Sequence, residues 1–256
     1  MAGVHDDYLS PEFIPMAHRG GALLTANLGI ENTLRAFSAA VDLGYRYLET
    51  DVHVTADGAL VAFHDEDLHR VTDVTGSISE FSLEEIRQLR VGEREPIPTV
   101  DELLETFPHI NFNIDIKGDA AVRPLDEAIR RHGAERRVCV GSFSRSRIRL
   151  FRALQPRVPT AVSPSGVMAM RAGMFRTAGK VFQVPLSHQV GPVTVDLVTP
   201  RSIARIHAAG MKIHVWTIDD PTTMHRLIDW GVDGIITDRP DLLKEVLRAR
   251  GMWSTR

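Results

Sequence analysis

The chain has 256 residues, with 30 Lys and Arg against 33 Asp and Glu. This near balance excludes the global basic field that nucleic acid or an anionic membrane surface would select, so we expect no nucleic-acid partner and no stable membrane association. The first fifteen residues lack the cationic start and apolar run of a signal peptide, and no stretch approaches the roughly 18 apolar residues that cross a bilayer. We therefore expect a cytoplasmic protein. The single cysteine, Cys139, lies in an apolar run and is expected to be buried and inert.

Apolar strand-like runs alternate with segments of helical period along the chain. Strands are predicted at residues 15–20, 46–55, 59–64, 110–117, 138–143, 160–163, 181–185, 212–217 and 234–237. Helices are predicted at 32–43, 83–89, 100–106, 125–132, 146–154, 202–209, 221–229 and 241–250. Several of them begin after a capping residue: Asn32, Ser82, Thr99, Ser144 or Ser146, and Asp219 or Asp220. Repeated βα units predict an α/β fold with parallel strands covered by helices.

The repeated units favour a closed (β/α)8 TIM barrel over an open doubly wound sheet, because no glycine-rich dinucleotide motif follows an early strand. The length is close to the about 250 residues typical of one such domain. Nine strand candidates compete for eight places, so either the run at 181–185 lies outside the barrel or two others form a hairpin at the rim. We expect an N-terminal extension at 1–14, a single barrel domain at 15–250 with a small insertion at about 68–98 after the third strand, and a tail at 251–256.

Charged residues recur on one face of two predicted strands. A strand displays residues i and i+2 on the same face, so Glu49 and Asp51 can reach one cation together. Asp115 and Lys117 share a face of a later strand in the same way. Parallel strands buried on both faces are normally apolar throughout, and active sites of such barrels lie at the carboxyl ends of the strands. These polar groups are therefore expected to converge on one mouth.

Two histidine motifs flank the acidic strand, and with the motifs around them the chain resembles the glycerophosphodiester phosphodiesterases, a family of the phospholipase C-like phosphodiesterase superfamily. The resemblance extends from residue 15 to the final helix. The matching motifs are His18-Arg19-Gly20, Glu31-Asn32-Thr33, Ala36-Phe37, Gly44, Glu49-Thr50-Asp51-Val52, Thr55-Ala56-Asp57-Gly58, His64-Asp65, Leu68, Arg70, Thr72, Gly76, Asn113-Ile114-Asp115-Ile116-Lys117, Ser142-Phe143, Val215-Trp216-Thr217 and Gly234-Ile235-Ile236-Thr237-Asp238-Arg239-Pro240.

Two features depart from the family pattern. Ile30 stands where the family usually has proline, after a longer segment at 21–29, and we expect this loop to influence substrate access. Asp115 stands where glutamate is often found, which is closer to the related phospholipases D of the sphingomyelinase type.

The resemblance implies metal-dependent hydrolysis of glycerophosphodiesters to an alcohol and sn-glycerol 3-phosphate. Glu49, Asp51 and Asp115 would hold one divalent cation, and such oxygen ligands suit Mg²⁺ or Ca²⁺. Arg19 and Lys117 would bind the phosphate. The three carboxylates and two basic groups sum to minus one, so a divalent cation and a phosphodiester monoanion bring the occupied site to neutrality.

By the same resemblance His18 would act as general base, on the glycerol hydroxyl beside the phosphate or on water, and His64 would protonate the leaving alcohol. Attack by the hydroxyl would give a cyclic phosphate that water later opens. The sequence does not fix the order of the two roles. Trp216 and Phe143 are candidates for the substrate pocket, although plain packing is an equal reading for Trp216 and the stronger one for Phe143.

Other residues near these motifs have simpler interpretations. His53 and His214 are expected to be structural. Asn32 is expected to be a helix N-cap, with Glu31 orienting Arg19 or the metal ligands. The Thr237-Asp238 pair is expected to close the barrel rather than to touch substrate.

Two alternative functions remain. A lysophospholipase D-like enzyme would act on an amphiphile, and Leu23, Leu24 and Leu28 in the access loop make this conceivable. A non-catalytic phosphate-binding barrel is disfavoured, because degenerate family members should have lost a histidine or an acid and this chain keeps them all. The sequence predicts neither the head group nor the oligomeric state.

Overall fold

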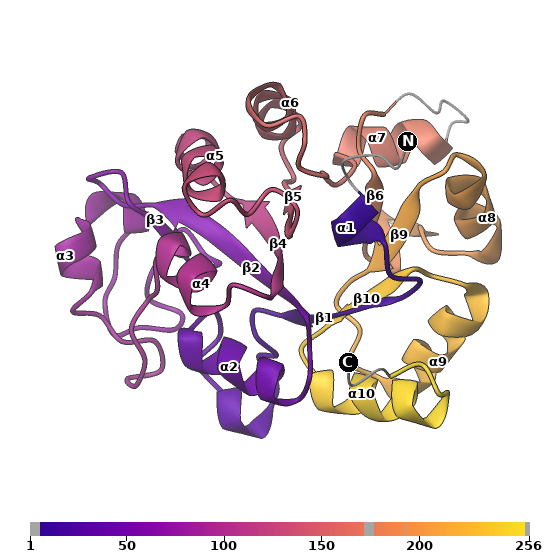
Figure 1. The fold of residues 1–256 in the computed structure, drawn as a ribbon, viewed down its shortest axis with the longest axis horizontal. Helices are drawn as coiled ribbons and strands as arrows, with labels where there is room; N and C mark the ends of the chain where they lie inside the picture. Colours follow the sequence, from indigo (N-terminus) through magenta and orange to yellow (C-terminus); the bar gives the residue numbers. More distant parts are fainter. Residues whose placement is uncertain (1–5, 172–176, 192, 254–256) are drawn as a thin grey trace.

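The computed structural model describes residues 6–171, 177–191 and 193–253, and in these parts seven parallel strands form one sheet that curls into a barrel (Figure 1). The strands are β1 (Ile14–His18), β2 (Tyr47–Val54), β4 (Asn111–Ile116), β5 (Val138–Gly141), β6 (Val181–Val184), β9 (Lys212–Val215) and β10 (Gly234–Thr237). Their order is β5-β4-β2-β1-β10-β9-β6. Single parallel bridges join Val140 to Thr160 and Ala161 to Val181, so residues 160–161 complete the ring between β5 and β6. The predicted TIM barrel is confirmed.

A hairpin accounts for the ninth strand candidate. β3 (Leu60–Ala62) pairs antiparallel with the end of β2, with Val52 opposite Ala62 and Val54 opposite Leu60. The run at 181–185 belongs to the barrel as β6. Of the two arrangements that the sequence allowed, the hairpin at the rim is therefore correct.

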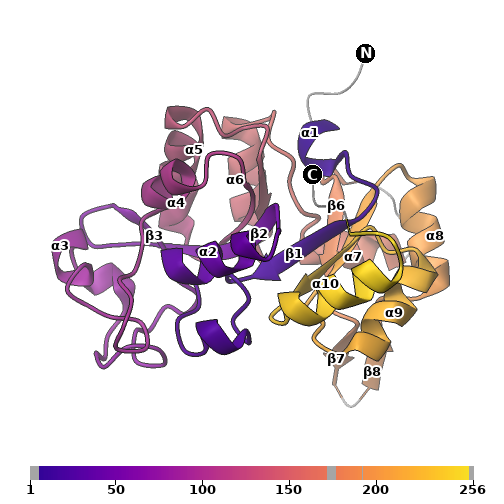
Figure 2. The same ribbon diagram turned by 60° about the horizontal axis from the view of Figure 1, so that its bottom comes forward.

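Helices surround the barrel (Figures 1 and 2). The longer ones are α2 (Leu34–Asp42), α4 (Val100–Thr106), α5 (Val122–Arg131), α6 (Arg145–Leu154), α7 (Pro164–Arg171), α8 (Pro200–Ala208), α9 (Pro221–Trp230) and α10 (Pro240–Ala249), and the short ones are α1 (Asp6–Leu9) and α3 (Leu83–Ile86). Single 3-10 turns lie at Thr25–Asn27, Ile78–Glu80 and Asp119–Ala121. The eight predicted helices are all present, whereas α1 and α7 were not predicted.

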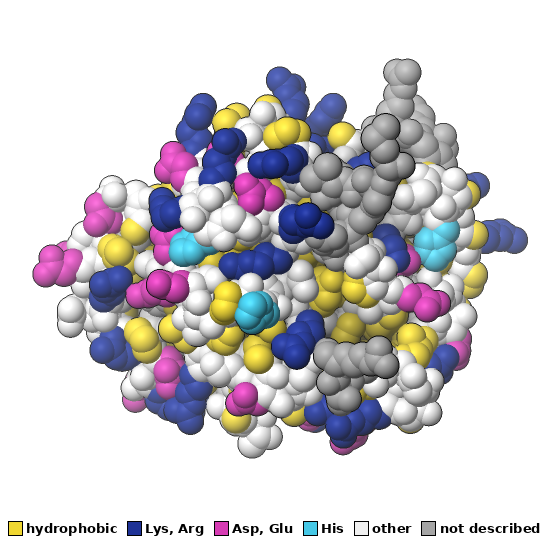
Figure 3. Space-filling model, viewed as in Figure 1, with side chains coloured by type: hydrophobic (Ala, Val, Ile, Leu, Met, Phe, Trp, Pro, Cys, Tyr) yellow, Lys and Arg dark blue, Asp and Glu magenta, His cyan; other side chains and the backbone are white. Residues whose placement is uncertain are grey.

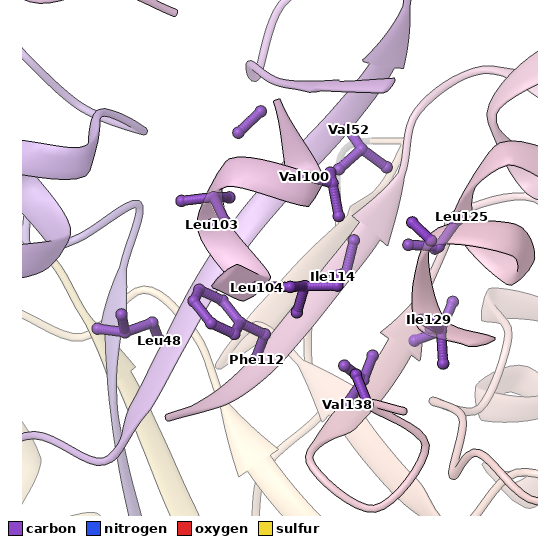
Figure 4. Packing of buried hydrophobic residues seen from close by; sticks show 14 of the residues in the cluster. Leu48, Val52, Val100, Leu103, Leu104, Phe112, Ile114, Leu125, Ile129 and Val138 are labelled. Atoms are coloured by element: carbon purple, nitrogen blue, oxygen red, sulfur yellow. The ribbon is translucent and has the colours of Figure 1, made fainter. Parts of the chain in front are cut away.

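Helix α4 illustrates how local sequence builds this outer layer. The Thr99 hydroxyl accepts a hydrogen bond from the amide of Glu102, whose side chain accepts one from the amide of Thr99 in return. This capping box satisfies two amides that the first helical turn leaves without partners. Leu104 then lies beside Phe112 and Ile114 of β4 (Figure 4), and Leu103 belongs to the same buried cluster. Burial of such side chains contributes about 2 kcal/mol each relative to exposure.

The amino end of the barrel is closed by an aromatic residue from α1. Tyr8 is buried among inward-facing side chains near the amino ends of the strands, including Ile14, Tyr47 and Cys139. Its ring packs edge-on against Tyr47 at 5.1 Å, and the Tyr47 hydroxyl donates to the carbonyl of Tyr8 at 2.7 Å. Apolar side chains thus fill the inside of the barrel from that end upward.

The opposite end carries a second hairpin, β7 (Ser187–Val190) and β8 (Val193–Asp196), which pair antiparallel outside the barrel sheet. Figures 1 and 2 together place this hairpin and α1 at opposite ends of the barrel. The sequence did not predict the hairpin, because β7 (Ser187–Val190) has no alternation of apolar and polar residues and β8 (Val193–Asp196) alternates over only four residues.

The segment between β3 and α4, where an insertion was expected, packs its own apolar residues together. Leu68, Ile78, Ile86 and Val91 form a buried cluster with Val61 of β3. Acidic and basic side chains are mixed over the face in Figure 3. No helix within the described residues has both the length and the apolarity needed to cross a bilayer.

Candidate active site

A cavity of about 340 Å³ lies at the carboxyl ends of the barrel strands. Every site residue predicted from the sequence lines it: His18, Arg19, Glu49, Asp51, His64, Asp115, Lys117, Phe143 and Trp216. These residues come from β1, β2 and β4 and from the segments that directly follow β1, β3, β4, β5 and β9. The barrel therefore brings together residues nearly 200 positions apart in the chain.

The acidic groups meet because β2 and β4 are neighbours in register. Asp51 stands opposite Asp115, and the Lys117 ammonium lies 2.9 Å from an oxygen of each. Burial would raise the pKa of Asp51, but the charges of Lys117 and Arg19 bring it below its ordinary value. Burial raises the pKa of Asp115 in spite of Lys117. One lysine therefore compensates two buried carboxylates only in part.

Glu49 is the least compensated acid of the site. Its carboxylate accepts a hydrogen bond from the amide of Arg19 at 3.3 Å and lies 3.7 Å from Nε2 of His18. Burial and the neighbouring charge of Asp51 raise the pKa of Glu49 to about 8. A buried carboxylate of this kind is stable in its ionised form only beside a cation. The donor chemistry of this wall of the cavity therefore fits a hard divalent ion.

The three acids do not yet form a set of metal ligands. Across the described ranges, no three histidine, cysteine, aspartate or glutamate side chains converge as a group that could hold a metal ion. Lys117, which pairs with both Asp51 and Asp115, occupies the space between these carboxylates. A cation bound by both of these carboxylates would require the Lys117 ammonium to move away from them.

His18 is held by a residue that sequence reasoning did not assign to the site. Its Nδ1 is hydrogen-bonded to Asp238 at 2.8 Å, and the amide of Asp238 donates to Asp219 at 2.8 Å. Burial alone would lower the pKa of His18, but the charge of Glu49 and the bond with Asp238 raise it. Asp238 is absent from the cavity lining, so the expectation that it closes the barrel rather than touches substrate stays a prediction, to which the structure adds the contact with His18. With 220 positions between the partners, no local pattern could have indicated the contact.

His64 has the same arrangement with a neighbour in sequence. Its Nδ1 lies 2.6 Å from Asp65. Burial lowers the pKa of His64, although the charge of Asp51 and the hydrogen bond with Asp65 act to raise it. In both site histidines a carboxylate thus engages Nδ1, which leaves Nε2 as the nitrogen available to a substrate.

Arg19 and Asn32 hold strained backbone conformations next to each other. Their φ angles are 50° and 59°, in the left-handed region that side chains other than glycine rarely adopt. The amide of Asn32 donates to the carbonyl of Arg19, and its side-chain amide approaches Asp51 at 3.4 Å. The N-cap of α2 is Thr33, not Asn32 as predicted. Asn32 instead joins the acidic strand to the loop that carries Arg19, because its side-chain oxygen also accepts from the Thr50 hydroxyl.

The outer part of the cavity is apolar. Phe143, whose surface is 65% exposed, packs edge-on against Trp216 at 6.0 Å, and the Lys117 ammonium lies 5.6 Å from its ring centre. Val167 and Met168 of α7 continue this wall. Residues 21–30 contribute nothing to the lining within the described part of the chain, so the expected influence of that loop on access is not seen in the cavity wall.

The residues expected to be structural lie where that reading requires. The ring of His53 is bonded to the carbonyl of His64, and Cys139 is fully buried, which raises the pKa of its thiol to about 12. His214 is fully buried outside the cavity lining, and burial lowers its pKa to about 4.

Comparisons with known proteins identify the family of the chain. The sequence model of the glycerophosphoryl diester phosphodiesterase family matches residues 18–242. A protein from Mycobacterium tuberculosis, named probable glycerophosphodiester phosphodiesterase 2, is 39% identical over 249 residues, which cover 94% of this chain and 92% of its own.

Two solved structures have the same fold. A structure from Silicibacter pomeroyi, 23% identical, has a TM-score of 0.82 with both chains covered completely. A phosphodiesterase from Oleispira antarctica, solved in complex with the product sn-glycerol-3-phosphate, is 24% identical, with a TM-score of 0.78 over 92% of this chain and 96% of that one. The chain therefore belongs to the glycerophosphoryl diester phosphodiesterase family, whose members are phosphoric diester hydrolases.

Proposed function

We propose that this protein hydrolyses glycerophosphodiesters to an alcohol and sn-glycerol 3-phosphate, with a divalent cation and with His18 and His64 as the groups that move protons. The observation that carries the proposal is the paired arrangement of these histidines. Each has Nδ1 engaged by a carboxylate, Asp238 or Asp65, and both line a cavity that also contains three acids. The pKa of His18 is raised and that of His64 is lowered, which suits a pair of imidazoles that hold and release protons in different steps.

Arg19 and Lys117 are proposed to bind the phosphodiester. Both lie in the cavity beside buried carboxylates, so each is already oriented before a substrate arrives. Charge-assisted hydrogen bonds from these groups to phosphate oxygens would replace part of the water lost on binding. In this scheme the Lys117 ammonium leaves Asp51 and Asp115 and binds a phosphate oxygen when the substrate and the cation arrive.

Glu49, Asp51 and Asp115 are proposed to hold one Mg²⁺ or Ca²⁺, since three carboxyl groups at this wall of the cavity are the oxygen ligands that a hard divalent cation prefers. A bound cation supplies Lewis acidity at the phosphoryl oxygen and stabilises charge in the transition state. His18 is assigned as the base that activates the nucleophile, and His64 as the acid that protonates the leaving alkoxide.

The test is hydrolysis of glycerophosphocholine by the purified protein, followed by release of glycerol 3-phosphate. Turnover is expected to disappear with a chelator and to return with Mg²⁺ or Ca²⁺. His18→Ala and His64→Ala should each lose about 10²-fold or more in kcat. His69→Ala is the matched control, because His69 is exposed and pairs with Asp67 in a similar geometry away from the cavity. Undiminished turnover in either site variant, or turnover that ignores the chelator, would contradict the proposal.

A lysophospholipid is the second candidate substrate, and the apolar outer wall of the cavity favours it. Val167, Met168, Leu197 and Trp216 offer a surface for an acyl chain next to the proposed phosphate-binding groups. Release of choline from lysophosphatidylcholine below its critical micelle concentration, beside glycerophosphocholine, decides between the two. A higher kcat/KM for the lysophospholipid would identify the amphiphile as the preferred substrate.

A further inference from the structure

Arg70 does not line the cavity, yet its guanidinium bridges Glu31 and Asp65. It is on the segment that follows β3, and its side chain is 42% exposed. Two of its nitrogens donate to the two oxygens of Glu31, at 3.1 and 2.6 Å, and Nε donates to Asp65. The motif that contains Arg70 was recognised in the sequence without a role being found for it.

The two carboxylates that Arg70 binds each hold a residue of the site. The other oxygen of Asp65 lies 2.6 Å from Nδ1 of His64. Glu31 also accepts from Arg19 at 2.9 Å. A continuous chain of charged hydrogen bonds therefore runs from His64 through Arg70 to Arg19, the residues proposed to donate a proton and to bind the phosphate.

The geometry differs from that of an ordinary surface ion pair, which has one contact between two exposed side chains and contributes little to stability. Arg70 uses three nitrogens on two acceptors, and a planar guanidinium fixes such acceptors relative to each other in a way that an ammonium cannot. The side chain of Glu31 is only 14% exposed. Burial would raise the pKa of Glu31, but the bond from Arg70 and the charge of Arg19 lower it, so the carboxylate stays ionised for Arg19.

The backbone of Arg19 is in an unfavourable conformation, so this residue needs support from its neighbours. A φ of 50° is unfavourable for a residue other than glycine and persists only where the surroundings impose it. Loss of the contact between Glu31 and Arg70 would free Glu31 and remove one restraint on the Arg19 side chain.

We propose that Arg70 is a positioning residue of the reaction, which sets His64 through Asp65 and Arg19 through Glu31. This inference rests on the proposed function for its effect on turnover. A displacement of about 1 Å in a reacting group can cost about 10²-fold, and loss of a residue that orients a ligand or catalytic group typically costs 10–100-fold. We therefore expect kcat/KM of Arg70→Ala to fall about 10–100-fold.

The experiment compares Arg70→Ala and Arg70→Lys with Arg87→Ala. Arg87 is the matched control, because it lies in the same segment, pairs with Glu102 at 3.2 Å and is remote from the cavity lining. Arg70→Lys should recover little activity, since one ammonium cannot bind both carboxylates as the guanidinium does. Millimolar guanidinium chloride should restore part of the activity of Arg70→Ala and leave Arg87→Ala unchanged.

An NMR titration of the His64 ring gives a readout that needs no turnover. His64 faces Asp65, Asp51, Arg19 and Lys117. In the native protein the Asp65 carboxylate interacts with both Arg70 and His64. Without Arg70 its charge acts on His64 alone, so the pKa of His64 should shift upward in Arg70→Ala and stay unchanged in Arg87→Ala.

The outcomes separate the two proposals. An upward shift, or activity rescued by guanidinium with an unchanged unfolding midpoint, supports the role of Arg70. A kcat/KM within twofold of Arg87→Ala together with an unshifted His64 overturns it. A wild-type protein that hydrolyses no phosphodiester overturns the proposed function, and the titration then still decides the position of His64.

Discussion

Replacement of His214 by leucine is expected to reduce the acid sensitivity of the fold. In the native state His214 is fully buried, and within the described residues neither ring nitrogen has a hydrogen-bond partner. Burial lowers its pKa to about 4 from the ordinary 6.5. As the pH falls through 6.5 the unfolded chain binds a proton at this ring and the folded chain does not, so stability decreases until the pH reaches about 4.

The magnitude follows from the proton affinities. At 1.36 kcal/mol for each tenfold change, the full penalty is about 3 kcal/mol, of which about 2.5 kcal/mol is expressed by pH 4.5. Urea unfolding at pH 7 and pH 4.5 measures it. The wild type should lose about 2.5 kcal/mol more than His214→Leu between these two values. Any change in packing caused by the leucine cancels, because it contributes equally at both pH values. The contributions of the carboxylates cancel as well, because both proteins contain them.

An exposed histidine supplies the control. His109→Leu removes an imidazole from the turn before β4 and should leave the acid dependence of the wild type unchanged. The reasoning is refuted if His214→Leu and the wild type lose stability in parallel, within about 0.5 kcal/mol, between pH 7 and pH 4.5. The ring would then be protonated in the folded protein, and a charge partner for it would have to exist.

Three further predictions concern the site and the barrel. Asp238→Asn should lower kcat about 10–100-fold with a smaller change in KM, because the amide cannot stabilise a protonated His18. Equal kcat values for this variant and the wild type in steady-state kinetics would exclude this role. Binding of Ca²⁺ measured by calorimetry should be lost in Asp51→Asn, and retained affinity would remove Asp51 from the ligand set. Tyr8→Phe should stabilise the fold by about 1 kcal/mol, since the Tyr8 hydroxyl is buried without a partner in the described residues, and a lower urea midpoint would reveal a partner.

The barrel strands could be predicted because their signals are local. Runs such as Phe112 to Ile116 alternate or are continuously apolar, and turn residues separate them. The choice between β6 and a hairpin at β3 could not be made, since both are short apolar runs and only the pairing of Val52 with Ala62 distinguishes them. Pairing depends on the whole ring, which no window of sequence contains.

The candidate site divides in the same way. Asp65 stands next to His64 in the sequence, whereas Asp238 reaches His18 only because β1 and β10 are neighbours in the closed barrel. Asn32 was taken for a helix cap, as its residue type suggests, but its left-handed backbone turns the side chain toward Asp51. Residue type predicted what these side chains can do, and topology determined which of them meet.

The closure of the barrel by Tyr8 also determines where a substrate can enter and where products can leave. Because Tyr8, Tyr47 and Cys139 fill the amino end, the described residues leave the cavity at the carboxyl end as the place where a substrate would enter and both products would leave. The fragment that keeps the phosphate would be the last to leave, because it remains bound to the groups that held the diester. If substrate and products use the same entrance, accumulated glycerol 3-phosphate should inhibit turnover competitively with respect to substrate. The rate of turnover would then depend on how quickly the cell removes glycerol 3-phosphate.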